Sequence, residues 1–482
     1  NPFNFCLIKL NKKTKIVATL GPSCSKKSII KQMIKNGVNV FRINFSHASH
    51  QEIIEQINLI RSLSEESNAN ISILADLQGP KLRIGIVKAN STVKKGDILE
   101  FLTENPFEGD SSKVYMTYSK FPKDVKKDEI VLLDDGKLIF KVISSDKKNR
   151  VVTQVIQGGV LKSKKGVNLP NTKISLPALT KKDVLDATFA IKQKVDWIAL
   201  SFVRNEKDLI DLKKLIDSHS KHKIPIIAKI EKPEAIRNID SIIKNCDGLM
   251  VARGDLGVEI PAAEVPLIQK QLVLNAKNAR IPVIIATQMM ETMTNSLTAT
   301  RAEVNDVANS VMDGADAVML SGETSVGQFP VEVIKTITSI IQKVENSPLI
   351  VVPNKPPKIR GDRYITKTIC YHAAIMANEI DAKSICTLTN SGYTAFQISA
   401  WRPSANILVF TSNKRILNQL NLLWGVKTFF YDRFESTDNT IEEVNKIAST
   451  HGYAEVGDML INLASMPISD KGMVNTLRVS II

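Results

Sequence analysis

The stretch DGLMVARGDLGVEIPAAEVPLIQKQLVLNAK, residues 247–277, contains the pattern that is most informative about the fold. Leu249, Met250 and Val251 form a short apolar run, which predicts a buried strand. The charged residues and glycines of RGDLG follow at once, and we expect them to form a loop, because glycine weakens strands and helices alike. From residue 262 onward apolar residues return at helical spacing, so the stretch predicts a strand, a polar loop and a helix in succession.

The same succession occurs eight times along the chain. Continuous aliphatic runs of this kind are typical of parallel strands buried on both faces. The segments between them have helical spacing, as in residues 26–37 and 300–314, which end at Gly37 and Gly314. Eight strand–helix units predict a (β/α)8 TIM barrel, whose active site lies at the carboxyl ends of the strands. The apolar runs cover residues 15–23, 38–47, 71–81, 195–204, 224–234, 247–257, 281–291 and 315–324.

Two segments of different character accompany the barrel. One interrupts it with short strands and hairpin turns, including a turn at Asp135-Gly136, which predicts a small all-β domain that acts as a lid. The other follows a Pro-rich linker and alternates strands with helices, which predicts a separate α/β domain. We therefore expect the barrel at 1–79 and 177–347, the inserted lid at 80–176 and the C-terminal domain at 358–482.

Composition narrows the class of protein. The 482 residues are 43% hydrophobic and 23% charged, and no apolar run reaches the roughly 18 residues of a membrane span. The first residues place basic side chains after apolar ones, the wrong order for a secretory signal. Five scattered cysteines predict no disulfide framework or zinc site, and a reducing, cytoplasmic location. The net charge of +15 is spread along the chain, so we expect anionic small substrates and no nucleic acid.

Acidic and basic side chains follow neighbouring strands of the predicted barrel. Glu231 and Asp255 follow adjacent apolar runs, and together they predict a site for a divalent cation, although each acid alone is better explained by an ion pair with a lysine. Lys229 lies two residues before Glu231, so both point to the same face of a strand. Its ammonium is suited to neutralise charge on an enolate or phosphoryl group.

Other rim residues suit the binding of an anion. Arg42, Asn44, Ser46 and His47 lie at another strand end, and Arg83 follows soon after; arginine matches phosphate with a two-point fork. Gly254 and Gly257 should let an anion approach the backbone near a helix start. Thr287 and Ser321 offer hydroxyl groups that either relay a proton or only bond within a turn, and the sequence leaves both open.

These motifs together resemble the pyruvate kinase family over essentially the whole chain. The resemblance rests on TKIVATLGPSC, FRINFSH, DLQGPK, KKGVNLP, AKIEKPEA, MVARGDLGVEIP, ATQMMETM and TRAEVNDVANSVMDGADAVMLSGET. It implies phosphoryl transfer from phosphoenolpyruvate to ADP, giving pyruvate and ATP, the last step of glycolysis. It also implies a Mg²⁺ or Mn²⁺ cofactor.

The resemblance also implies roles for single residues. Lys229 and Arg42 would support transfer, and Glu231 and Asp255 would bind the metal. Thr287 and Ser321 would lie on the proton route, with the donor itself left open. The substrate would contact Arg42, Lys229, Gly254, Asp255 and Thr287, and the nucleotide would contact Asn44, His47, Arg83 and Lys165.

One position departs from many members of the family. Those members bind a monovalent cation at residues matching Asn44, Ser46, Asp76 and the carbonyl of Leu77, and they carry an acid where this chain has Lys81. A fixed ammonium at this position can replace the charge of K⁺, so we expect an enzyme that does not require K⁺.

The C-terminal domain resembles the effector domain of the family. Thr389, Ser391, Gly392 and Thr394 match a loop that binds the phosphate of an effector, so a sugar phosphate is a candidate ligand. A domain that only supports a homotetramer is the alternative, and the tetramer itself is implied only by resemblance. For the whole chain, the alternatives are an aldolase or lyase on the same barrel, a non-catalytic relative and a nucleic-acid-binding protein.

Overall fold

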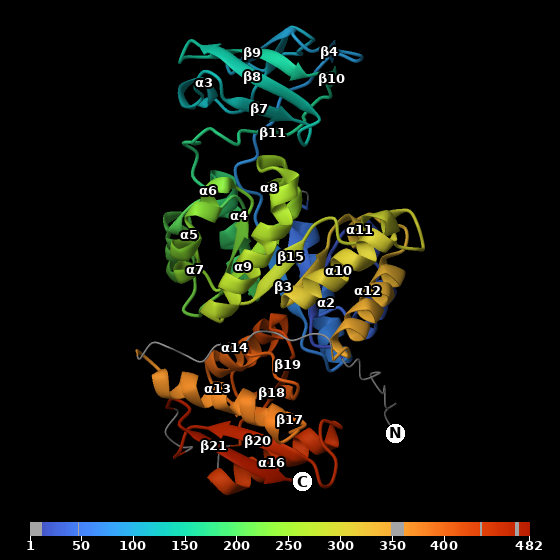
Figure 1. Cartoon of the computed structure of the whole chain (residues 1–482), viewed down its shortest axis with the longest axis vertical. Helices are drawn as coiled ribbons and strands as arrows, with labels where there is room; N and C mark the ends of the chain where they lie inside the picture. The colour runs from blue at the N-terminus through green and yellow to red at the C-terminus, as the bar shows by residue number, and fades with distance from the viewer. Residues whose placement is uncertain (1–11, 47, 349–360, 434–435, 468–471) are drawn as a thin grey trace.

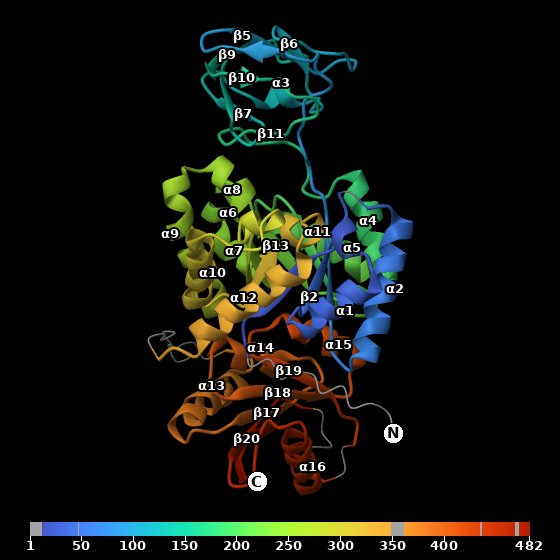
Figure 2. The same ribbon diagram turned by 90° about the vertical axis from the view of Figure 1, so that its right-hand side faces the viewer.

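The computed structural model describes residues 12–46, 48–348, 361–433, 436–467 and 472–482. Three parts follow one another along the long axis of the molecule (Figure 1). A mostly antiparallel sheet lies at one end, a closed barrel in the middle and an open α/β sheet at the other end; the view turned by 90° shows the same order (Figure 2). No helix in these ranges is long and apolar enough to cross a membrane.

The central part is a closed barrel of parallel strands in the order β1-β16-β15-β14-β13-β12-β3-β2. The predicted TIM barrel is therefore confirmed, and each apolar run supplies one strand. The strands are almost entirely buried on both faces, which explains why their sequences do not alternate. Their bounds are β1 Lys15–Thr19, β2 Val40–Asn44, β3 Ser72–Asp76, β12 Trp197–Leu200, β13 Ile226–Ile230, β14 Gly248–Ala252, β15 Val283–Ala286 and β16 Ala317–Leu320.

An outer ring of helices covers the barrel. Ser49, Thr180 and Thr300 begin three of these helices with capping boxes, and Gly314 ends one in the left-handed conformation, with φ 95°. The main helices are α1 Lys27–Lys35, α2 His50–Glu66, α4 Lys181–Lys192, α5 Glu206–His219, α6 Pro233–Arg237, α7 Ile239–Asn245, α9 Val265–Ala279, α10 Arg301–Asp313 and α12 Pro330–Glu345.

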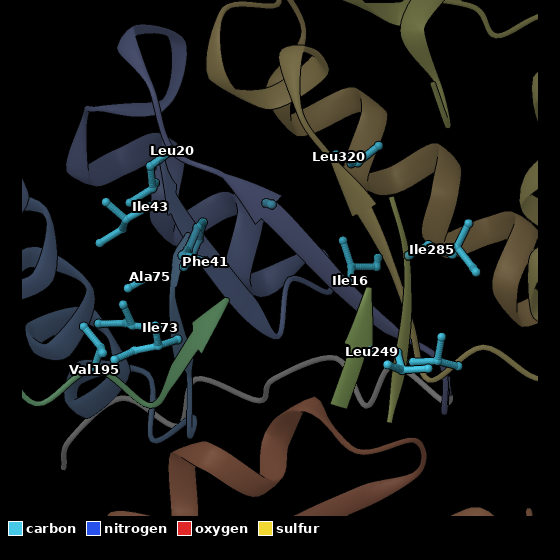
Figure 3. Close-up of a cluster of buried hydrophobic side chains, with 14 of the residues drawn as sticks. Ile16, Leu20, Phe41, Ile43, Ile73, Ala75, Val195, Leu249, Ile285 and Leu320 are labelled. Atoms are coloured by element: carbon cyan, nitrogen blue, oxygen red, sulfur yellow. The ribbon is translucent and has the colours of Figure 1, made fainter. Parts of the chain in front are cut away.

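The barrel has two layers of core. Side chains such as Ile16, Phe41 and Ile285 fill the space between strands and helices (Figure 3). A second layer fills the inside of the barrel and includes Trp197 and Met250. Because the interior is packed, only the ends of the barrel can hold a ligand.

The predicted RGDLG loop is wrong, because these residues begin a short helix, α8 Arg253–Glu259. A glycine in a helix costs about 0.5–1 kcal/mol relative to alanine, and tertiary contacts offset this cost. Arg253 Nη1 lies 2.6 Å from Asp306 Oδ1, and Leu256 is fully buried. Asp255 lies in the first turn, where a carboxylate interacts favourably with the helix dipole.

The inserted segment between β3 and α4 forms a six-stranded sheet in the order β11-β7-β8-β9-β5-β6 and a two-stranded sheet of β4 and β10. The expected hairpin is present: β7 joins β8 through Asp134, Asp135 and Gly136, all with positive φ. Its own hydrophobic core includes Phe101 and Phe140. The elements are β4 Thr92–Val93, β5 Ile98–Leu102, β6 Lys113–Tyr115, α3 Phe121–Asp124, β7 Ile130–Leu133, β8 Leu138–Ser145, β9 Arg150–Gln157, β10 Gly159–Val160 and β11 Val167–Asn168.

The C-terminal part is a five-stranded sheet in the order β19-β18-β17-β20-β21, with only β21 antiparallel. It lies against the amino ends of the barrel strands, where Lys15 Nζ donates to Val426 O at 2.8 Å and Trp197 Nε1 to Gln419 O at 3.0 Å. The carboxyl ends of the strands therefore face the inserted sheet (Figure 1). Its elements are α13 Tyr364–Glu379, β17 Ser384–Leu388, α14 Tyr393–Ala400, β18 Asn406–Thr411, α15 Lys414–Gln419, η4 Leu420–Leu422, β19 Val426–Phe430, α16 Thr437–Thr450, β20 Met459–Ala464 and β21 Thr476–Ile481.

Four of the five cysteines lie in the part of the chain that the structure describes. Cys24, Cys246, Cys370 and Cys386 are buried free thiols, and Cys6 lies outside the described residues. Burial raises the pKa of Cys24 to about 11, so this thiol stays protonated and unreactive near neutral pH.

Candidate active site

The carboxyl ends of the barrel strands enclose a cavity of about 90 Å³. Side chains from most of the barrel strands reach it, as expected for a TIM-barrel site. The structure therefore brings together most of the predicted rim residues. The lining consists of Arg42, Asn44, Ser46, Asp76, Leu77, Gln78, Lys81, Ser201, Phe202, Lys229, Glu231, Met250, Ala252, Asp255, Ala286, Thr287, Met319 and Ser321.

Asp76, the last residue of β3, organises the cations of this cavity. Its carboxylate accepts from Arg42 Nε at 2.7 Å and from Lys229 Nζ at 3.0 Å. Burial opposes ionisation of Asp76, but Lys229 and Arg42 outweigh it and hold its pKa below the usual value. One buried, ionised carboxylate thus fixes two positive groups at the floor of the site. The sequence alone predicts Asp76 only as part of a monovalent-cation site and gives no sign of this role.

Lys229, on β13, is fully occupied by polar partners. Besides Asp76, its ammonium contacts Glu231 Oε1 at 3.2 Å and Ser201 Oγ at 2.8 Å. Burial alone would lower the pKa of Lys229, but the two carboxylates raise it above the ordinary value. The lysine is therefore a permanent cation in the site. Ser201 was missed in the sequence; its position directly after the apolar run of β12 was the available signal.

Glu231 and Asp255 are a pair of carboxylates that could bind a divalent cation. Glu231 is 1% exposed, and its Oε2 accepts from the backbone N–H of Phe202 at 2.7 Å. Burial raises the pKa of Glu231, Lys229 opposes the rise and the charge of Asp255 adds to it. A divalent cation would relieve this repulsion, and two carboxylates with free positions for substrate oxygens suit Mg²⁺. Among the described residues, no group of three or more acidic, His or Cys side chains could hold a metal alone.

Thr287 and Gly254 meet at the adjacent part of the rim. Gly254 N donates to Thr287 Oγ1 at 2.7 Å, and the hydroxyl donates to Ala286 O at 2.6 Å. A Cβ on Gly254 would lie 3.3 Å from that oxygen, so glycine permits the close approach. Thr287 has φ 72°, which is unusual for a β-branched residue and common at functional sites. The approach of an anion to the backbone of Gly254 stays a prediction, and the contact that the structure shows at this residue is with Thr287.

Ser321, the second predicted hydroxyl, follows β16 and lines the same cavity. Its backbone N–H donates to Glu323 Oε2 at 2.7 Å, and Glu323 Oε1 accepts from Met290 N at 3.1 Å. Buried Glu323 therefore ties together the loops after β15 and β16. Neither contact decides between a proton relay and a structural role for the Ser321 hydroxyl.

The residues matched to a monovalent-cation site also lie in this cavity. Asn44 Oδ1 accepts from Ser46 N at 3.0 Å, and Ser201 Oγ donates to Leu77 O at 2.6 Å. Lys81 lines the cavity beside them. Burial, and then Lys229, lower the pKa of Lys81, while Asp255 opposes the shift.

A second cavity of about 230 Å³ lies between the lid and the rim. Arg83 and Lys165 line it, as expected for a nucleotide site, and Lys81 and Asp255 line both cavities. Arg83 Nη1 donates to Lys164 O at 2.9 Å, and Lys165 Nζ lies 2.9 Å from Asp134 Oδ1. His47, also predicted to contact the nucleotide, lies outside the described residues.

The predicted effector loop precedes α14 in the C-terminal part. Gly392 has φ 79°, and its N–H donates to Thr389 Oγ1 at 3.0 Å. The hydroxyl of Thr394 is 2.8 Å from that of Thr387, and the residue is 3% exposed. Ser391 is exposed, so the four residues differ in how readily a ligand could reach them.

Comparisons with known proteins agree with this geometry. Residues 11–334 match the family "Pyruvate kinase, barrel domain", and residues 367–480 match "Pyruvate kinase, alpha/beta domain". Pyruvate kinase 2 of Synechocystis sp. is 40% identical over 477 residues, which are 98% of this chain and 80% of that protein. The pyruvate kinase of Corynebacterium glutamicum is 38% identical over 473 residues, 98% of each chain. The crystal structure of a pyruvate kinase from Cryptosporidium parvum has a TM-score of 0.90 and 32% identity, and the match covers 98% of this chain and 96% of that one. The chain belongs to the pyruvate kinase family and is a phosphotransferase.

Proposed function

We propose that this protein transfers the phosphoryl group of phosphoenolpyruvate to ADP at the rim of the barrel, giving pyruvate and ATP. The observation that carries the proposal is the buried network in which Asp76 holds Arg42 and Lys229 side by side. Phosphoryl transfer depends on positioning and on neutralisation of charge, and needs little covalent chemistry from the protein. Two fixed cations at the floor of an enclosed site supply these needs.

The two cavities suit two substrates. The inner cavity suits a small phosphorylated acid, and the outer one suits a nucleotide diphosphate beside Arg83 and Lys165. Because Lys81 and Asp255 line both cavities, we place the transferring group between them. The lid above the outer cavity would exclude water, which otherwise competes with ADP for the phosphoryl group.

We assign Glu231 and Asp255 as the residues that would hold Mg²⁺ or Mn²⁺. The raised pKa of Glu231, caused first by burial, supports the assignment because a cation would offset the cost of two buried negative charges. When bound, a divalent cation neutralises charge on substrate oxygens. Lys229, 3.2 Å from Glu231 Oε1, holds that carboxylate in place and adds positive charge on the same side.

Proton transfer to the enolate needs a donor that lines the inner cavity. Thr287 and Ser321 are our candidates, since both line the inner cavity. The hydroxyl of Thr287 is fixed by Gly254 and Ala286, which supports an oriented proton route through this residue. We further propose that Lys81 supplies the charge that K⁺ provides elsewhere in the family, so that K⁺ is not required.

We propose a cytoplasmic homotetramer, with four buried free thiols supporting a reducing location. Two separate surfaces support the assembly. Leu267 is 71% exposed and Leu274 45% on α9, and edge strand β21 exposes Ile481 by 73%. Two different two-fold interfaces on one chain would together produce a tetramer. A light-scattering mass four times that of one chain is expected.

We also propose that Thr389, Ser391, Gly392 and Thr394 mark a site for a sugar-phosphate effector. A reaction rate that sugar phosphates leave unchanged would argue against this site.

The reaction is tested by following phosphoenolpyruvate, ADP and ATP by ³¹P NMR with Mg²⁺. We expect the ATP formed to equal the phosphoenolpyruvate consumed. An aldolase or lyase would consume the substrate without ATP formation, and a non-catalytic relative would leave the spectrum unchanged.

A further inference from the structure

The lid and the barrel rim meet at one buried carboxylate, Glu259, the last residue of α8. Its side chain is completely buried. Glu259 Oε1 contacts Lys232 Nζ at 2.5 Å and accepts from Asn168 Nδ2 at 2.9 Å. Its other oxygen is buried and has no hydrogen-bond partner among the described residues. The sequence analysis gave this glutamate no role.

The residues joined here belong to three functional pieces of the molecule. Glu259 ends the same short helix that carries Asp255. Lys232 directly follows Glu231, the other proposed metal ligand. Asn168 lies in β11 of the lid. One carboxylate therefore connects the two segments that carry the proposed metal ligands to the lid.

The lid makes a second contact with α8 through the β7–β8 hairpin. A Cβ on Gly136 would lie 3.7 Å from Val258 Cγ1, so the tip of the hairpin packs against this helix. Asp134 in the same hairpin pairs with Lys165, and β11 pairs with β7. Asn168 and the proposed phosphate-binding Lys165 therefore belong to one hydrogen-bonded unit that is docked on α8.

These contacts surround the outer cavity. Asn168, Lys232, Lys165 and Asp255 all line it. A ligand in this cavity would touch the lid on one side and the rim with the proposed metal ligands on the other. Glu259 sits behind both walls and sets their spacing without lining the cavity itself.

We infer that Glu259 is a positioning residue that links the lid to Glu231 and Asp255, so that its loss loosens both ADP binding and cation binding. The inference rests on the proposed function of the two cavities. Glu259 acts through Asn168 on the lid and through Lys232 on the rim. Loss of one hydrogen bond to the charged carboxylate of Glu259 should raise the Kd of ADP roughly tenfold.

The lid side of the link is tested with Asn168→Ala, which leaves the ion pair between Lys232 and Glu259 intact. The matched control is Gln157→Ala, which removes a lid hydrogen bond of the same length, 2.9 Å to Lys137 O, with no tie to the barrel. We expect the Kd of ADP, measured by calorimetry with Mg²⁺ present, to rise roughly tenfold in the first variant and less than twofold in the control. Equal Kd values in the two variants would overturn the inference.

The rim side is tested with Glu259→Gln, which we expect to raise both the Kd of ADP and the Mg²⁺ concentration needed for half-maximal rate. The double variant with Asn168→Ala should bind ADP no worse than Glu259→Gln alone, because both changes break one link. A merely structural role would lower kcat and thermal stability and leave both binding constants unchanged, which would refute the inference. If Glu259→Gln does not fold, the Asn168→Ala comparison still decides the question.

Hydrogen exchange gives a reading that does not depend on turnover. In Asn168→Ala, amides of β11 and α8 should exchange faster, while those of β8 and β9 keep the wild-type rate. Unchanged exchange in β11 and α8 would contradict the link. Wild-type turnover tests the proposed function separately, because calorimetry and exchange report on the link even in a protein that forms no pyruvate.

Discussion

Replacing Lys229 with methionine removes the cation that contacts both Asp76 and Glu231. Its ammonium lies 3.0 Å from Asp76 Oδ1 and 3.2 Å from Glu231 Oε1. Methionine keeps much of the volume of the side chain and removes its charge. Arg42 then remains as the only positive group in contact with Asp76 among the described residues.

The expected loss follows from burial. Lys229 is 8% exposed, so its charge acts through a medium of low dielectric constant. Loss of one preorganised charge that stabilises a transition state costs about 2.7–4 kcal/mol, or roughly 10²–10³ in kcat. Breaking a buried ion pair also destabilises the fold by roughly 3–5 kcal/mol. The pKa of Glu231 should rise further, because Lys229 currently lowers it.

The assay is the rate of pyruvate formation at saturating substrates, with thermal unfolding as a measure of folding. Lys335→Met is the matched control, since this lysine is exposed and pairs with Glu332 on the outside of α12. We expect full activity in the control and a kcat reduced by roughly 10²–10³ in a folded Lys229→Met protein. A folded variant that keeps more than a tenth of the wild-type kcat would refute the reasoning.

Three further predictions concern cations and protons. The rate should be the same with and without K⁺, and Lys81→Glu should create a requirement for K⁺; strong K⁺ activation of the wild type would contradict this. Asp255→Asn should raise the half-saturating Mg²⁺ concentration at least tenfold, because it removes a proposed metal ligand. In the wild type this concentration should rise as the pH falls, because burial raises the pKa of Glu231 and Mg²⁺ needs the ionised carboxylate. Burial raises the pKa of Asp196 from 3.8 to about 6, so the folded state holds this proton more tightly than the unfolded chain. Protonated Asp196 should therefore stabilise the fold below pH 3.8, and this contribution should be lost as the pH rises through about 6. Urea unfolding should show a loss of about 3 kcal/mol in the free energy of unfolding of the wild type relative to Asp196→Asn. Parallel pH curves for the two proteins would contradict this.

The barrel was predictable because each strand is a continuous apolar run. Such a run can be identified from the local sequence alone, without knowledge of the strands that pair with it. Gly37 and Gly314 likewise mark helix ends, because glycine readily adopts the positive φ angles found there. The helix at RGDLG was not predictable in the same way. Local propensity disfavours it, and the contacts that stabilise it, such as Arg253 with Asp306, join residues distant in the sequence.

The site was predictable only as a set of residue types at strand ends. That rule placed Arg42, Lys229 and Glu231 on one rim, but it could not show which carboxylate holds the cations. Asp76 takes that role because the strand register sets Asn44 opposite Asp76 and brings the ends of β2 and β3 level. The role of Glu259 could not be predicted from the sequence, because its partners come from the lid and from the loop after β13. No local sequence pattern indicates a contact between such distant segments.

The central claim is that the rim of this barrel forms pyruvate and ATP from phosphoenolpyruvate and ADP with a divalent cation. The most direct measurement is the rate of pyruvate formation by the wild-type protein with both substrates and Mg²⁺, compared with reactions that lack ADP or contain a chelator. The account predicts turnover only in the complete mixture. Turnover without ADP, or undiminished by the chelator, would contradict it.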